Sequence, residues 1–268
     1  MSRSKRLFTA HQYDEALGAA RKEASGRGSD DYKIGPALIV GRSLILLGKL
    51  AEAREHLETL AAARHCGVRL GQHFTYAGLA SWFADDSDRA LALWKKGLTT
   101  GHHAQEGMEI PWTLLYASAR RRDSFPRQDA VRISTEHSKR LSQQASEHVI
   151  NRFALGQIDE ITAVAQLEIL NEGRFKDRFM KRDQSRIDFF AGLHALGRSD
   201  ETGFYDRMVS CASLTNYETI DVQLVIAECE INQGPAKWRR KLTELLAVGT
   251  HGDPKVRQKR ANVRGKRR

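Results

Sequence analysis

The feature that most constrains the fold is an internal repeat with a period of 37 residues. Residues 34–65 align with residues 71–102, and small and bulky side chains recur in the same order in both segments. The matched pairs are Gly41 with Gly78, Ala53 with Ala90, and Leu57 with Trp94. Small residues allow two helices to approach closely, and a bulky residue fills the gap beside them. The repeat therefore predicts antiparallel helix pairs that stack on one another.

The stretch from Gly48 to Leu57, GKLAEAREHL, holds the turn and second helix of one such pair. Gly41 takes the small position of the first helix. In this pattern the chain resembles tetratricopeptide-repeat proteins of the bacterial type. The resemblance implies an all-α fold, namely a right-handed superhelical α-solenoid of antiparallel helix pairs. It also implies a protein that works by binding other proteins.

Weaker copies of the pattern lie on both sides of the two matched segments. They are residues 11–24, which resemble a second helix after a shortened first one, residues 108–141, and residues 186–214. In the last of these copies the second helix is one residue out of step. We therefore expect a solenoid domain over residues 1–250 that becomes irregular in its C-terminal half.

Two further segments are helical in pattern without matching a repeat. Residues 142–175 fit no unit, although apolar side chains recur at helical spacing at Ile158, Ile161, Val164, Leu167 and Leu170. Residues 216–232 predict a closing helix with one apolar face, formed by Ile220, Leu224, Ala227 and Ile231.

The formal net charge of +10 is concentrated at the C-terminus. Residues 255–268 hold eight Lys and Arg and no acidic residue, so the rest of the chain carries only +2. With so few apolar side chains, residues 251–268 cannot offset their own ordering entropy, and we expect a disordered tail. Its cations are Lys255, Arg257, Lys259, Arg260, Arg264, Lys266, Arg267 and Arg268. Three interpretations of these cations stay open: a solvated tail without a specific ligand, binding of nucleic-acid phosphates without reading base sequence, and binding to an anionic membrane surface.

No arrangement of residues typical of a catalytic or metal site occurs in the sequence. The glycine-containing stretch 41–49 lacks the spacing of a phosphate-binding loop, and Leu50 replaces the Ser or Thr that would reach magnesium. His65, Cys66 and His73 lack the paired spacing of zinc ligands. We therefore expect a protein without cofactor or metal that is not an enzyme. Catalysis by residues far apart in the sequence is the alternative.

No apolar run approaches the roughly 18 residues of a membrane-spanning helix. The N-terminus has basic residues but lacks the apolar core of a secretion signal. Three cysteines are too few and too scattered for a disulfide framework. We therefore expect a cytoplasmic protein.

A partner site is implied by the resemblance, because the first helices of successive tetratricopeptide units line a concave groove. Mapping the groove positions onto this sequence gives Leu38, Arg42, Trp82, Phe83, Trp112, Arg122 and Arg186. Apolar anchors in a groove suit an amphipathic helix, and arginine can hold a carboxylate with two hydrogen bonds. The alternative is that the aromatic side chains pack the repeat units against each other.

These features lead to a protein-interaction scaffold or adaptor that binds a peptide or helix of another protein in its concave groove. One alternative is an accessory nucleic-acid-binding protein that uses the basic tail. Another is a bacterial immunity-type protein that neutralises a toxin.

Overall fold

The chain is all-helical wherever it is described. The computed structural model describes residues 1–26, 30–62, 70–100, 109–121, 124–139, 145–172, 176–214 and 221–250, and these contain fourteen α-helices and no strand. The helices are α1 (Arg3–Thr9), α2 (Tyr13–Ser25), α3 (Asp30–Leu46), α4 (Leu50–Ala62), α5 (Leu70–Phe83), α6 (Ser87–Thr100), α7 (Glu109–Arg121), α8 (Ser124–Ser138), α9 (Ser146–Ala154), α10 (Glu160–Leu170), α11 (Lys176–Gly197), α12 (Glu201–Ser213), α13 (Val222–Gln233) and α14 (Ala236–Thr250). None of the helices in these ranges is long and apolar enough to cross a membrane.

Helices that follow one another in the chain pack side by side. The two matched repeat segments form the pairs α3–α4 and α5–α6, and the weaker copies form α7–α8 and α11–α12. The shortened first helix expected before residue 13 is α1, which is seven residues long and packs on α2. The prediction of an all-helical chain with helices packed in neighbouring pairs is confirmed.

Five turns between neighbouring helices share one geometry. Each contains a single residue with positive φ, which the right-handed helix cannot accommodate. These residues are His11, Gly48, Asp85, Gly156 and Ser199. In the α3–α4 turn, the N–H of Lys49 donates to the carbonyl of Leu44 at 2.9 Å, and the same six-residue closure recurs in the other four turns. The closure satisfies carbonyls at the helix end, so these turns reverse the chain in few residues.

The matched glycines allow each helix pair to pack closely. A Cβ atom added at Gly41 would lie 2.5 Å from Leu57, and one added at Gly78 would overlap the indole of Trp94. Trp94 is fully buried, and its Nε1–H donates to the carbonyl of Thr75 at 3.1 Å. The recurrence at 37 residues therefore records a contact between the two helices of each pair.

Replacing Gly78 by alanine should destabilise the protein, because the methyl group would displace a buried, hydrogen-bonded indole. We expect the free energy of unfolding to fall by about 1–3 kcal/mol, as measured by urea denaturation. Gly18 in α2 is the control, since a Cβ there would meet nothing within 4 Å. Gly18→Ala should instead stabilise the protein by about 0.5–1 kcal/mol. Equal effects of the two substitutions would contradict the close contact at Gly78.

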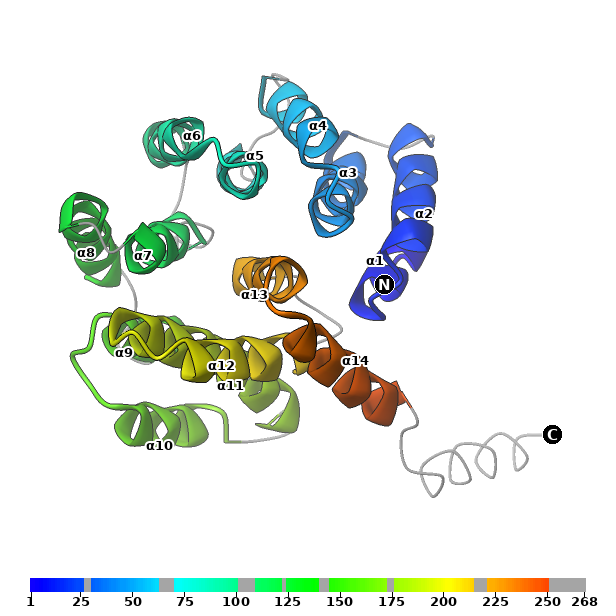
Figure 1. Cartoon of the computed structure of the whole chain (residues 1–268). Helices are drawn as coiled ribbons and strands as arrows, with labels where there is room; N and C mark the ends of the chain where they lie inside the picture. Colours follow the sequence, from blue (N-terminus) through cyan, green and yellow to red (C-terminus); the bar gives the residue numbers. More distant parts are fainter. Residues whose placement is uncertain are drawn as a thin grey trace.

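Helix α13 lies inside the curve that the other helices form (Figure 1). It packs against α3, α5, α7, α11 and α12, which come from most of the length of the chain. We call the sides of α3, α5, α7 and α11 that contact α13, together with His11 and Tyr13 at the α1–α2 turn, the inner surface. The following α14 leads outward and packs on α12 and α13 along a narrow strip formed by Trp238 and Leu242.

The burial of α13 differs from the one-faced closing helix that the sequence predicts. Nine of its residues are buried, namely Val222, Gln223, Val225, Ile226, Ala227, Glu228, Cys229, Glu230 and Ile231. Leu224 is only half-buried, and Ile220 lies outside the described residues. A helix that is apolar on every side is a helix surrounded by protein. Glu228 and Glu230 can join this buried set because each has a polar partner across the interface.

Helix α10 is the converse case. Of the apolar residues at helical spacing in this segment, Leu167 is buried, as is Ala163, and α10 packs against α9 and α11. Ile161 and Ile169, however, are 82% and 69% exposed. Helical spacing marks α10 correctly as a helix, but it does not show which of its apolar side chains find a covering element.

Candidate functional site

Where the structure describes them, the residues predicted to line a groove lie on α3, α5, α7 and α11, and most of these are buried. Leu38, Arg42, Phe83, Trp112 and Arg186 are buried, whereas Trp82 is half-buried. Arg122 lies outside the described residues. The helices that carry these residues, α3, α5, α7 and α11, each pack against α13 (Figure 1). Contact of these residues with a partner protein stays a prediction.

The aromatic residues of this set connect successive inner helices. Trp82 of α5 donates its Nε1–H to the hydroxyl of Tyr116 in α7 at 3.2 Å, and the two rings meet edge to face at 5.8 Å. Trp112 of α7 meets Phe190 of α11 edge to face at 5.4 Å. These are the packing contacts between units that the sequence leaves open as an alternative.

Arg42 is buried against an aromatic ring. Its guanidinium carbon lies 4.2 Å from the centroid of Tyr76 in α5, close enough for a cation–π interaction. Its Nε has no hydrogen-bond partner among the described residues. Burial raises the pKa of Tyr76 well above its usual value, with Arg42 acting in the opposite direction, so the phenol is neutral beside the cation.

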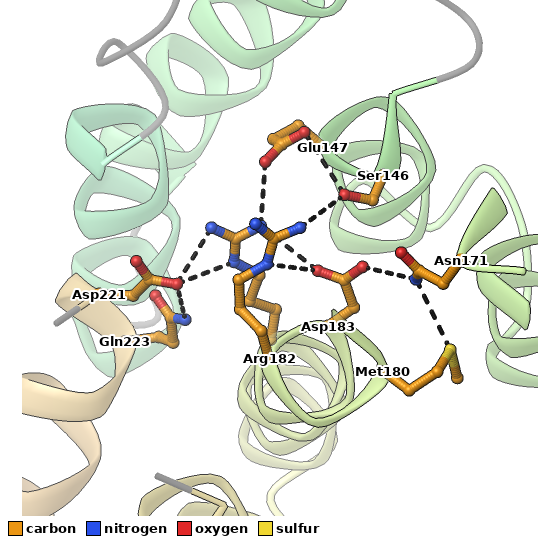
Figure 2. Close-up of polar contacts among 9 residues, drawn as sticks. Ser146, Glu147, Asn171, Met180, Arg182, Asp183, Asp221 and Gln223 are labelled. Carbon is orange, nitrogen blue, oxygen red and sulfur yellow. Dashed lines mark hydrogen bonds and ion pairs between the residues drawn. The ribbon is translucent and has the colours of Figure 1, made fainter. Parts of the chain in front are cut away.

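A buried polar cluster holds the N-terminal end of α13 (Figure 2). Its centre is Arg186 of α11, whose Nη1 lies 3.1 Å from Glu147 and 3.5 Å from Asp183. Its Nη2 and Nε lie 3.0 and 3.2 Å from Asp221, the residue that precedes α13. The guanidinium also lies 5.2 Å from the ring of Trp112. One arginine therefore ties α7, α9 and α11 to the start of α13.

Further side chains complete the hydrogen bonding of this cluster. Arg182 binds Asp183 at 3.0 Å and donates to Ser146 at 3.1 Å, while the amide of Asn171 donates to Asp183 at 2.9 Å. Figure 2 shows these groups converging between the helices. Burial of an ion is costly unless the ion is paired and hydrogen-bonded. The carboxylate of Asp183 is fully buried, and the contacts with Arg182, Arg186 and Asn171 meet this requirement.

The pKa directions agree with an ionised cluster. Burial on its own raises the pKa of Glu147, but the nearby charge of Arg186 and further hydrogen bonds lower it below its usual value. Burial on its own lowers the pKa of Arg186, but Asp221, Glu147 and Asp183 raise it above the usual value. Both groups are therefore charged at neutral pH.

A second set of contacts receives Glu230, near the C-terminal end of α13. The hydroxyl of Tyr116 and the guanidinium of Arg120, both on α7, donate to its carboxylate, with the Arg120 Nε at 2.6 Å. Burial raises the pKa of Tyr116 well above its usual value, and the charge of Glu230 raises it further. The chain Trp82–Tyr116–Glu230 therefore links α5, α7 and α13 by hydrogen bonds.

A third set receives Glu228 on the other side of α13. The hydroxyl of Tyr13 donates to its carboxylate, and Nδ1 of His11 lies 3.1 Å from it. Residues two apart on a helix point in nearly opposite directions. Glu228 therefore reaches the α1–α2 turn while Glu230 reaches α7, so α13 bridges two walls of the inner surface.

Asp221, Glu228 and Glu230 are functional candidates that no sequence motif predicts. Their partners lie 215 residues away for Glu228 and 110 residues away for the Arg120 contact of Glu230. One signal exists in the sequence: two acidic residues within the otherwise apolar stretch VQLVIAECEI. Carboxylates in a helix that is apolar on all sides must find buried partners.

Within the described ranges, no group of three or more His, Cys, Asp or Glu side chains is placed to hold a metal ion. Cys211 and Cys229 are free, buried thiols, and burial raises the pKa of both. His65 and Cys66 lie outside the described residues, as do all eight cations of the C-terminal tail. Nucleic-acid binding by the tail therefore stays a prediction.

No protein-family model matches the chain, and neither a curated protein nor a solved structure matches it. The chemistry of the inner surface is therefore the basis of the functional proposal.

Proposed function

We propose that the protein is a tetratricopeptide-like α-solenoid that acts as a protein-interaction scaffold, by binding and not by catalysis. Its inner surface is the binding surface for a helix or peptide of a partner protein. The observation that carries this proposal is that the inner surface already accommodates a helix, α13, through apolar contacts and three carboxylates. A surface built in this way suits helix-in-groove recognition.

A second candidate is binding of nucleic acid, and the exposed face of α14 favours it. Lys237, Arg239 and Arg240 are exposed on this helix, which leads into the eight cations of residues 255–268. Together they form a basic segment that could neutralise several phosphates. This candidate uses a different part of the chain and is compatible with a scaffold.

Affinity purification of the tagged full chain from its source organism separates the two candidates. Its companion is a variant with the eight Lys and Arg of residues 255–268 replaced by Gln. Under nuclease treatment and raised salt, the scaffold proposal predicts one protein that both chains retain and that binds the purified chain directly with a fixed stoichiometry. Capture that requires nucleic acid and disappears with the tail charges would overturn it in favour of the second candidate.

A further inference from the structure

We infer that the partner segment is a helix with the chemistry of α13, apolar on most sides and carrying carboxylates, and that α13 must leave the inner surface before that helix binds. This inference rests on the proposed scaffold function and specifies its ligand.

The inner surface presents cationic and hydroxyl donors that require acidic partners. Arg186 binds Asp221, Arg120 and Tyr116 bind Glu230, and Tyr13 with His11 binds Glu228. All of these donors come from helices α1 to α11 or their turns, and all of the acceptors come from α13 or the residue before it. Arg186 would keep Glu147 and Asp183 as partners. An entering helix without carboxylates would, however, leave Arg120, Tyr116 and Tyr13 without a carboxylate acceptor, which disfavours it.

The apolar part of the interface has the same character. Val225, Ile226 and Ile231 of α13 are buried together with the carboxylates. A partner helix with matching side chains would bury an equal apolar area and restore each ion pair. Replacement of α13 by the partner helix would then cost little in lost contacts. The advantage of α13 over the partner helix is its covalent link to the chain, which gives it an effective concentration on the order of 1 mM.

The direct test is a competition between α13 and its own sequence in trans. The probe is a fluorescein-labelled peptide of residues 221–233, capped at both ends and kept reduced. The control peptide carries Asp221→Asn, Glu228→Gln and Glu230→Gln. The receiving proteins are the wild-type chain, the variant Glu228→Gln/Glu230→Gln, whose α13 lacks two anchoring charges, and the matched control Glu168→Gln/Glu172→Gln. The control removes the same charge from two exposed residues, one in α10 and one just after it.

Fluorescence anisotropy should show that the Glu228→Gln/Glu230→Gln variant binds the acidic peptide at least tenfold more tightly than the wild type and the control variant do. The uncharged peptide should bind that variant at least tenfold more weakly than the acidic peptide. The inference would be overturned if the double variant bound both peptides with equal affinity. It would also be overturned if all three proteins, each with the circular dichroism spectrum of the wild type, bound the acidic peptide equally.

Two further measurements test the inference if the Glu228→Gln/Glu230→Gln variant does not fold. Glu228→Gln alone leaves the Arg120–Glu230 pair in place and should bind the peptide more tightly than the wild type, by a smaller factor. In the wild-type chain, a millimolar excess of the acidic peptide should accelerate hydrogen exchange of residues 222–233, and unchanged exchange counts against replacement. A captured partner whose bound segment lacks carboxylates would contradict this inference but agree with the scaffold function. The absence of any protein partner would contradict the scaffold function itself.

Discussion

Replacing Arg186 by alanine should lower the free energy of unfolding by roughly 3–5 kcal/mol, because the substitution removes one partner of a buried ion cluster. Glu147, Asp183 and Asp221 would then share the cluster with Arg182 as its remaining cation. Carboxylates left buried without a partner cost several kcal/mol each. Asp183 is fully buried, so water cannot replace the lost contact without local opening.

The control for this substitution is an arginine whose ion pair is open to solvent. Arg132 pairs with Glu136 at 3.5 Å within α8, and both side chains are more than half exposed. Arg132→Ala should change the free energy of unfolding by no more than about 0.5 kcal/mol. Urea denaturation measures the free energy of unfolding of both variants. A loss below about 1 kcal/mol for Arg186→Ala would mean that the cluster is solvated and does not anchor α13.

Replacing Ile226 by alanine should lower the free energy of unfolding by about 2–5 kcal/mol, the usual range for truncating a fully buried isoleucine. Ile226 is 0% exposed and lies on α13, so its side chain is enclosed by the helices around it. The same substitution at Ile161 of α10, which is 82% exposed, should have an effect within about 0.5 kcal/mol.

The two isoleucine variants differ in burial and not in chemistry, so their comparison by urea denaturation isolates the enclosure of α13. A similar small effect at both positions would show that α13 is not enclosed. A similar large effect would show instead that α10 is covered, for example by a second chain, and repeating the measurement over a range of protein concentrations would reveal such association.

Residues 34–102 illustrate what the sequence could predict. Gly41 packs on Leu57 and Gly78 packs on Trp94, and both contacts join residues 16 positions apart. Such contacts repeat along the chain, so their spacing is visible as an alignment of the sequence with itself. The helix pairs α3–α4 and α5–α6 follow from them.

Helix α13 illustrates what the sequence could not predict. Its apolar and acidic residues indicate that it is covered, but its neighbours are α3, α5, α7, α11 and α12, which are distant in sequence. Periodicity describes one helix at a time and carries no information about which other helix covers it. The described groove residues lie on four of the helices that α13 contacts, whereas the contact of α13 with all four is visible only in the structure.

The same reasoning applies to the polar residues of the site. Arg186 is among the residues predicted from the resemblance, and it lies on the inner surface next to Asp221. Arg120, Tyr116 and Tyr13 are not among them, since arginine and tyrosine are common on helices and become informative only when a carboxylate faces them. The partners of Glu228 and Glu230 lie on different helices, so no short sequence motif joins them.

Helix α13 occupies the inner surface of the helical array. Hydrogen exchange of the wild-type chain measures this enclosure directly. Amides exchange slowly where opening a segment requires disruption of the core, and faster where a helix is covered on one side only. If α13 is enclosed, the amides of Val225 to Gln233 exchange as slowly as those of the buried part of α5 and much more slowly than those of α10. Exchange of α13 at the rate of α10 would show that α13 is not enclosed by the other helices.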